Sequence, residues 1–537
     1  MNRALLNFGY NAAFSLLTAI AVARLFPTYT TFSATQDEPY HVASGMEWIE
    51  KGAYTYELQH PPLARVAVAL GPYLGGLRGH SIRSSPYEEG NAILYSTGDP
   101  AENIRLARLG SLPFLILGCA VVVLWSWRWF GKPEAIAALT LFVCLPPILG
   151  SAALATNDMA CAATVALALY HFVRWLEKPD QQRAAWFGVA VGLAFLSKFS
   201  AVLFLPVCFI AAYFVLDKRK IPRGHTHIAT AAALALLIIW AGYRFSLRPA
   251  SPTHGQYAAI DKRIANPVLR RAVYAVIEAP LPLRDAVAGV VAVAKHNRVG
   301  HPSYLLGRYR RTGWWYFFPV VLAVKTPIGF LILAIAGLAL VFWTRDAIPW
   351  QQRVTAIFAI AILAASMTSR IDLGVRHILP IYPILAVLAG NSVITLIQKS
   401  RWTAIVAGLL VAWAATDSIL AHPDYLAYFN PFASRHPERV LCESDLDWGQ
   451  DLYRLRDTLK ARGVDQVSIR YFGTAPLDRA GLPPHRDLSP TRPASGWAAI
   501  SLHALVMENA ENGSFEWLKQ YQPVERVGKS IYLYRLP

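Results

Sequence analysis

Eleven apolar runs constrain this chain more than any other feature, because about 20 apolar residues can cross the roughly 30 Å core of a bilayer only as a helix. The runs occupy 5–26, 106–127, 134–150, 159–176, 184–197, 200–216, 228–245, 314–343, 354–368, 377–397 and 402–420. Those at 184–197 and 354–368 are short. Of the 537 residues, 55% are hydrophobic and only 16% are charged. The sequence therefore predicts a mostly α-helical polytopic membrane protein with about eleven transmembrane helices.

Lys and Arg residues in the short loops predict the orientation of the chain. With eleven crossings, the short basic loops alternate onto the side of the N-terminus: 128–132, 174–183, 217–223, 344–353 and 399–401. The positive-inside rule assigns that side to the cytoplasm. The long loops at about 27–104 and 246–313 are then external. We expect a membrane module over 1–420 and an extracytoplasmic domain over 421–537.

The two long loops carry opposite charge. Residues 27–104 contain 4 Lys/Arg and 9 Asp/Glu, whereas 246–313 contain 11 Lys/Arg and 3 Asp/Glu. The tail from 421 onward is neutral, with 14 residues of each sign. A nucleic-acid-binding protein would carry its basic residues on a soluble surface, so no nucleic-acid partner is expected. An acidic loop facing a basic loop suits a carboxylate base opposite a phosphate-bearing substrate.

The tail reads as a small soluble α/β unit. Its apolar pattern predicts a helix over 449–463, a short helix over 515–521, and strands over 440–442, 467–472, 496–505 and 530–534. No Gly-rich phosphate-binding loop occurs in it. The five cysteines are scattered without metal-ligand spacing, which is typical of small buried side chains.

Asp37 and Glu38 follow the first apolar run, and charged groups at a membrane boundary are candidate functional residues. A partly desolvated carboxylate there has the basicity needed to take a proton from a hydroxyl group. The alternative is an ordinary helix N-terminus, since Pro39 follows directly. His60-Pro61-Pro62 predicts a rigid turn that places His60 and Arg65 near the same cavity.

Several motifs, in order along the chain, resemble the GT-C glycosyltransferases that use polyprenyl-phosphate sugars. This group includes protein O-mannosyltransferases, lipid A aminoarabinose transferases and bacterial family 39-like proteins. The motifs are Asp37-Glu38-Pro39, His60-Pro61-Pro62-Leu63, Thr156-Asn157-Asp158, Leu196-Ser197-Lys198, 313–319, 325–327, 374–380, 425–430 and 445–451. Arg65 stands where the mannosyltransferase pattern usually has Lys, which weakens an assignment of mannose as the donor sugar.

The resemblance implies a GT-C helical bundle in a bacterial inner membrane and a general-base role for Asp37. It places Glu38 and Asp158 near the acceptor or the phosphate; an interfacial helix cap is the alternative for Asp158. The Asp, Glu and His residues are compatible with a divalent metal but show no diagnostic spacing. No cofactor is assigned, and metal dependence stays open.

Basic residues are the second part of the predicted site, because a departing polyprenyl phosphate develops negative charge that Arg or Lys must meet. Lys198 and Lys325 interrupt apolar runs, with snorkelling to the membrane surface as the alternative for both. Arg308 and Arg311 precede an aromatic pair, where general lipid binding is the alternative. Arg376-His377 begins an external helix, and an Arg376–Asp372 ion pair is its alternative.

These inferences predict an inverting glycosyltransferase that moves a sugar from polyprenyl phosphate to a lipid, glycan or protein acceptor outside the cell. Membrane lipids are its surroundings, and an apolar groove between helices holds the isoprenoid tail. The alternative is a transporter or lipid-sugar flippase, whose buried charges would line a pathway. The sequence shows neither the inverted repeats nor the paired broken helices typical of that class.

Overall fold

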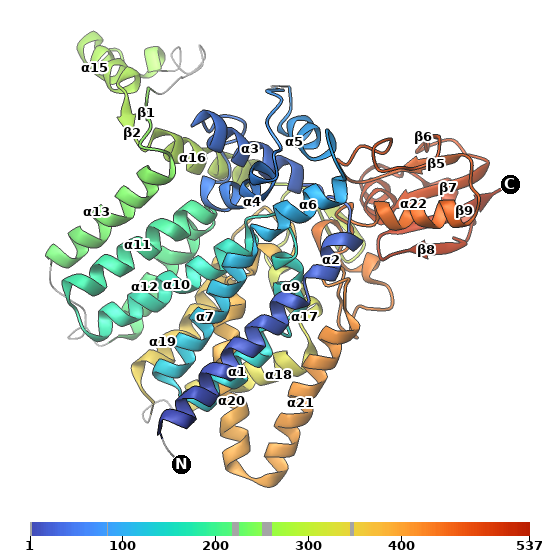
Figure 1. Cartoon of the computed structure of the whole chain (residues 1–537). Helices are drawn as coiled ribbons and strands as arrows, with labels where there is room; N and C mark the ends of the chain where they lie inside the picture. Colours follow the sequence, from blue (N-terminus) through green and yellow to red (C-terminus); the bar gives the residue numbers. More distant parts are fainter. Residues whose placement is uncertain (1–2, 83, 217–224, 250–259, 344–347) are drawn as a thin grey trace.

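The computed structural model describes residues 3–82, 84–216, 225–249, 260–343 and 348–537. All eleven predicted apolar runs lie in helices that together form a bundle (Figure 1). The bundle consists of α1 (Arg3–Ala23), α7 (Leu112–Trp129), α8 (Lys132–Phe142), α9 (Pro146–Ala152), α10 (Asp158–Glu177), α11 (Gln181–Ser197), α12 (Ala201–Val215), α13 (His225–Gly242), α17 (Phe317–Lys325), α18 (Ile328–Trp343), α19 (Trp350–Ser366), α20 (Ile381–Lys399) and α21 (Arg401–Leu420). The predicted helical membrane fold is confirmed.

Fewer helices than eleven are long enough to cross a membrane alone. Within the described ranges, six helical stretches meet that requirement by length and composition, and α8 with α9 makes a seventh across a 67° bend. Prolines divide two predicted runs, at Pro146 between α8 and α9 and at Pro327 between α17 and α18, because proline cannot donate the hydrogen bond that continues a helix. The other runs form shorter helices, such as the 15-residue α12.

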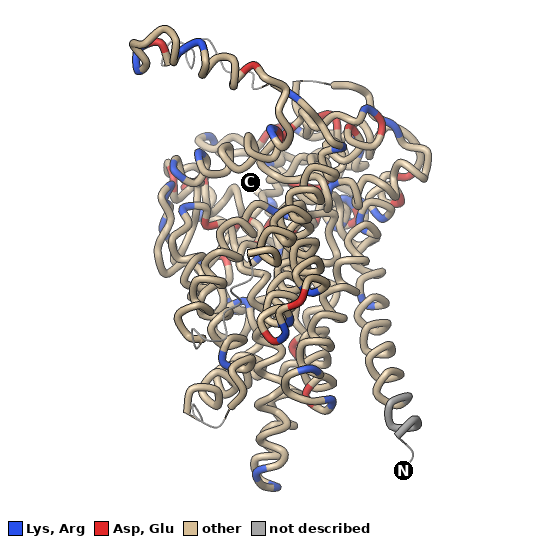
Figure 2. Tube along the Cα trace, turned by 90° about the vertical axis from the view of Figure 1, so that its left-hand side faces the viewer, with Lys and Arg blue, Asp and Glu red and all other residues tan. Residues whose placement is uncertain are grey.

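The two long loops fold over the same end of the bundle as the tail (Figure 1). The first loop forms α2 (Phe26–Thr31), α3 (Glu38–Lys51), α4 (Pro62–Leu74), α5 (Pro86–Tyr95) and α6 (Pro100–Leu109). The second forms β1 (Leu247–Arg248), α15 (Pro267–Glu278), β2 (Leu281–Pro282), α16 (Arg284–Val299), β3 (Ser303–Leu305) and β4 (Arg308–Arg310). Charged residues gather at this end, while the spans are mostly uncharged (Figure 2).

The predicted cytoplasmic loops meet at the opposite end of the bundle. Arg128, in the last turn of α7, forms a 2.8 Å ion pair with Glu177 at the end of α10. Gln352, at the start of α19, donates a hydrogen bond of 2.7 Å to the carbonyl of Trp129. Three of the five basic loops are therefore neighbours, as the orientation argument requires. The loop at 217–223 and residues 344–347 lie outside the described residues.

The tail contains a five-stranded sheet in the order β6-β5-β7-β9-β8, with helix α22 (Leu452–Ala461) packed beside it. β5 pairs in parallel with β6 and β7, and β9 pairs antiparallel with β7 and β8. The strands are β5 (Val467–Arg470), β6 (His485–Asp487), β7 (Gly496–Ser501), β8 (Glu525–Val527) and β9 (Ile531–Leu536). The strand predicted over 440–442 is wrong, because short 3₁₀ turns at Pro437–Arg439 and Glu443–Asp445 flank this segment.

Candidate active site

Asp37 stands at the N-terminus of α3, but its side chain does not cap the helix. Its Oδ2 instead accepts a hydrogen bond of 2.9 Å from Nη1 of Arg376, a residue 339 positions further along the chain. Pro39 fixes the backbone of the first turn of α3, and it therefore also helps to fix the position of Asp37, the residue just before the helix. The side chain of Asp37 remains 21% exposed, so a substrate can reach its carboxylate.

Arg376 lies in a single 3₁₀ turn, Val375–Ile378, that follows Gly374. Its guanidinium stacks on the indole of Trp448 at 4.2 Å from the ring centroid. Burial by itself would lower the pKa of Arg376, but the nearby carboxylates of Asp37, Glu443 and Asp158 raise it above its usual value. Asp372, the partner proposed in the alternative reading, accepts a hydrogen bond of 2.7 Å from the backbone N–H of Trp314 instead.

Asp158 and Lys198 form a second ion pair beside the first. Lys198 follows the last residue of α11, and its Nζ lies 2.6 Å from Oδ1 of Asp158 in the first turn of α10. Thr156 donates a hydrogen bond of 3.1 Å to the other carboxylate oxygen. Lys198 is only 7% exposed. It is therefore paired inside the protein and does not snorkel to the membrane surface.

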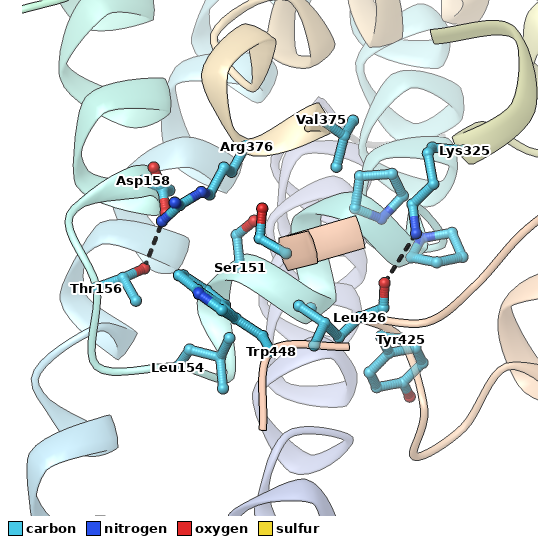
Figure 3. Close-up of a pocket in the computed structure, with 14 residues that line it drawn as sticks. Ser151, Leu154, Thr156, Asp158, Lys325, Val375, Arg376, Tyr425, Leu426 and Trp448 are labelled. Carbon is cyan, nitrogen blue, oxygen red and sulfur yellow. Dashed lines mark hydrogen bonds between the residues drawn. The ribbon is translucent and has the colours of Figure 1, made fainter. Parts of the chain in front are cut away.

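A small pocket, with a volume of about 20 Å³ open to water, lies next to these pairs. Figure 3 shows Asp158 and Arg376 at one end of the pocket and Lys325 at the other, with Ser151 and Trp448 between them. Lys325 is buried and donates hydrogen bonds to the carbonyl oxygens of Leu426 at 2.8 Å and Asp445 at 2.5 Å. Its ammonium thus binds the tail to α17 and forms one wall of the pocket.

Glu38 does not line this pocket and lies in the protein interior. It is 1% exposed and forms an ion pair with Arg108, which the sequence analysis did not single out. The backbone N–H groups of Thr35 and Ala155 also donate to its carboxylate, each at 2.8 Å. Burial alone would raise the pKa of Glu38, but Arg108 and these N–H groups lower it below its usual value. Glu38 is therefore a fixed anion within the fold.

Arg65 and His60 belong to a network that joins α3 to α4. Arg65 is fully buried and lies 2.7 Å from Glu57, which the sequence analysis also missed, and over the ring of Tyr40 at 4.4 Å. The Nδ1 atom of His60 lies 3.2 Å from the same Glu57 carboxylate. Arg65 thus braces the external helices, whereas His60 keeps 28% of its side chain exposed.

Neutral histidines surround the two ion pairs. Burial lowers the pKa of His377 well below its usual value, and the nearby charges of Lys198 and Arg376 lower it further. Burial and the neighbouring His296 lower the pKa of His301 to about 4. These rings are uncharged near pH 7. They add hydrogen-bonding groups to the site without adding charge.

Arg308 and Arg311 lie at the rim of the molecule. Arg308 is exposed on β4, and Arg311 is exposed directly after that strand. The hairpin of β3 and β4 contacts the tail, where Tyr309 donates a hydrogen bond of 2.7 Å to Glu511. Arg311 is close enough to contribute to the lowered pKa of His301.

Glu443 is a site residue that the sequence analysis did not identify. Its backbone has φ of +57°, in the left-handed region that is uncommon for a non-glycine residue. Burial raises the pKa of Glu443 to about 7, and the Arg376 guanidinium opposes that rise. Its neighbour Asp445 accepts a hydrogen bond of 3.0 Å from the N–H of Val375. The motif 445–451, which begins two residues after Glu443, was the nearest signal in the sequence. Nothing in that motif indicated a contact with Arg376.

Within the described residues, no group of three or more His, Cys, Asp or Glu side chains is placed to hold a metal ion. The carboxylates near the pocket are held by Arg and Lys side chains or by backbone N–H groups. Two such pairs, Asp37–Arg376 and Asp158–Lys198, lie beside the pocket.

Comparisons with known proteins agree with this architecture. A family model described as dolichyl-phosphate-mannose-protein mannosyltransferase matches residues 101–242. ArnT from Cupriavidus metallidurans, in a structure bound to undecaprenyl phosphate, aligns over 97% of both chains with a TM-score of 0.50 and 15% identity. The archaeal oligosaccharyltransferase AglB from Archaeoglobus fulgidus aligns over 96% of this chain and 72% of its own, with a TM-score of 0.53 and 12% identity. No curated protein matches by sequence. The predicted GT-C fold is confirmed.

Proposed function

We propose that this chain is an integral-membrane glycosyltransferase that moves a sugar from a polyprenyl-phosphate donor to an acceptor outside the cytoplasm. The observation that carries the proposal is the Asp37–Arg376 contact of 2.9 Å beside the Asp158–Lys198 pair. In this proposal Asp37 is the base, and Arg376 and Lys198 are the cations that bind the phosphate. The family model that matches 101–242 spans both Asp158 and Lys198, and ArnT of similar fold was solved with undecaprenyl phosphate.

The geometry supports a direct displacement. Within the described part of the chain, no side chain or backbone group donates a hydrogen bond to Oδ1 of Asp37, so this atom is free to accept the proton of an acceptor hydroxyl. The acceptor oxygen forms its bond to the anomeric carbon as the bond from that carbon to the phosphate oxygen breaks. Arg376 and Lys198 meet the charge that develops on the phosphate. A single displacement inverts the anomeric configuration.

The orientation follows from the basic loops at the opposite end of the bundle. If that end is cytoplasmic, the site faces outward from a bacterial inner membrane. The donor lipid enters from the membrane with its isoprenoid chain between helices, and a lipid, glycan or protein acceptor approaches from the aqueous side.

The test is sugar transfer by purified protein from a panel of polyprenyl-phosphate sugars and acceptors. We expect turnover by the wild type and a loss of about 10²–10⁴-fold in Asp37→Asn, the usual contribution of a general base. Asp478→Asn is the matched control, because that side chain is 94% exposed on the tail. Equal turnover in Asp37→Asn would remove this base from the mechanism. Donor-lipid translocation without transfer would favour a flippase.

A further inference from the structure

The tail reaches back to the chain immediately before Asp37. Gln36 donates its backbone N–H to the carbonyl of Trp448 at 2.9 Å, and Ser33 donates its N–H to the carbonyl of Gln450 at 3.0 Å. The Ser33 hydroxyl also donates to the carbonyl of Gly449 at 2.9 Å. Two segments more than 400 positions apart are thus joined by several bonds. The backbone of Asp37 is held from the tail side.

The same tail segment supports the side chain that faces Asp37. Trp448 is 1% exposed and lies face-on to Arg376, whose Nη1 contacts Asp37. Within the described residues, neither Nε1 of Trp448 nor Nε of Arg376 has a hydrogen-bond partner, although both atoms are buried. Ring stacking is therefore a principal contact that orients this guanidinium toward Asp37. A cation over a tryptophan face is stabilised most when both groups are desolvated.

We infer that Trp448 is a positioning residue for the transfer reaction, acting on Asp37 through Arg376, and that the tail is in this way part of the catalytic centre. The inference rests on the proposed function. A tryptophan that only filled space would affect stability, whereas a positioning residue must affect turnover through Arg376. The two roles therefore make different predictions for combined variants.

The experiment compares the turnover of Trp448→Leu, Trp448→Phe and Trp497→Leu in the full-length protein. Trp497 is the matched control, since it stacks with Arg462 and Arg535 in the same tail but does not line the pocket. We expect kcat to fall about 30-fold in Trp448→Leu, the equivalent of ~2 kcal/mol for a desolvated cation–π contact. Trp448→Phe should retain most of the wild-type kcat, and Trp497→Leu should keep kcat within about threefold of the wild-type value.

A double-mutant cycle separates positioning from packing. In an Arg376→Gln background, Trp448→Leu should cause little further loss of kcat, because its effect passes through Arg376. The inference is overturned if the wild type is active and Trp448→Leu lowers kcat no more than Trp497→Leu does. It is also overturned if the losses of kcat in Trp448→Leu and Arg376→Gln multiply fully in the double variant. A wild type that transfers no sugar overturns the proposed function and the catalytic part of this inference with it. The same cycle read by thermal unfolding needs no substrate, and strictly additive shifts there would exclude the contact itself.

Discussion

The carboxylate of Glu38 and the guanidinium of Arg108 form a two-point ion pair in the protein interior, with both N–O distances at 2.8 Å. Asp37, the preceding residue, points instead to Arg376 at the pocket. Two adjacent acids therefore have separate partners and separate tasks. Glu38 fixes the start of α3 against α6, and that fixed start sets the position of Asp37.

The first prediction separates these tasks by stability. Glu38→Ala should lower the free energy of unfolding by about 3–5 kcal/mol, because it leaves Arg108 buried without its partner. Asp37→Asn should cost less than this, because the amide oxygen can still accept the hydrogen bond of Arg376, and Glu443 and Asp158 also lie near that guanidinium. Thermal unfolding in detergent measures both. A Glu38→Ala protein that is as stable as the wild type but inactive would indicate that Glu38 takes part in the reaction itself.

The second prediction concerns donor binding. Lys198→Met should weaken binding of undecaprenyl phosphate about 10- to 100-fold, because a hydrogen bond to a charged group contributes about 1.5–3 kcal/mol. Competition with a labelled polyprenyl phosphate gives the affinity. Lys460→Met, at an exposed tail position, is the control. Unchanged affinity in Lys198→Met would mean that this lysine only neutralises Asp158.

A third prediction tests the tail segment through its backbone. Gly449 has φ of +84°, and a Cβ there would lie 2.7 Å from the carbonyl oxygen of Phe472. Gly449→Ala should therefore cost about 1–3 kcal/mol of stability and reduce turnover as well. Gly463 also has positive φ, but a Cβ at that position would meet nothing within 4 Å. Gly463→Ala should cost only about 1 kcal/mol and leave turnover unchanged, as thermal unfolding and transfer assays can verify.

The fourth prediction is a pH dependence of stability. Burial raises the pKa of Asp372, Glu443 and Asp447 to about 7 in each case. Between about pH 4.5 and 7 the native state holds these protons while the unfolded chain has released them. The stability contributed by these three groups should therefore fall as pH rises to about 7, whereas the lowered pKa of His301 favours the native state as pH rises through the same range. Melting curves across this range measure the slope.

The control for this slope is a single amide substitution. Asp372→Asn removes one of the three titrations and still offers an oxygen to the N–H of Trp314. The stability of Asp372→Asn relative to the wild type should therefore rise between about pH 4.5 and 7, and that of Asp478→Asn should not. An Asp372→Asn variant whose stability keeps a constant offset from that of the wild type between about pH 4.5 and 7 would contradict the raised pKa of Asp372.

The sequence predicted the helical membrane fold and the end of the bundle where the site lies. Apolar length and loop charge carry that information locally. It also singled out Asp37, Asp158, Lys198 and Arg376, which the structure brings to one place. Each of these is a charge placed where an unpaired charge is costly, and such residues can be recognised without knowing their partners.

The pairing of these charges was beyond the reach of local patterns. Asp37 and Arg376 are 339 positions apart, and only the packing of the whole bundle makes them neighbours. Arg108 was missed because it ends an ordinary amphipathic helix, α6, and its role is visible only from Glu38. Trp448 resembles any other tryptophan of the tail until Arg376 lies over it.

The hydrogen bonds between 33–36 and 448–450 also determine when, during synthesis, the candidate site can be completed. Synthesis runs from the N-terminus, so Asp37 reaches the membrane long before the ribosome makes Trp448. Until then the backbone before Asp37 lacks its hydrogen bonds to 448–450, and Arg376 lacks its contact with the ring of Trp448. On the proposed function, a chain whose membrane helices are all inserted but that still lacks Trp448 should not transfer sugar. The segment 448–450 is thus made long after Asp37, and its synthesis completes the contacts around that residue.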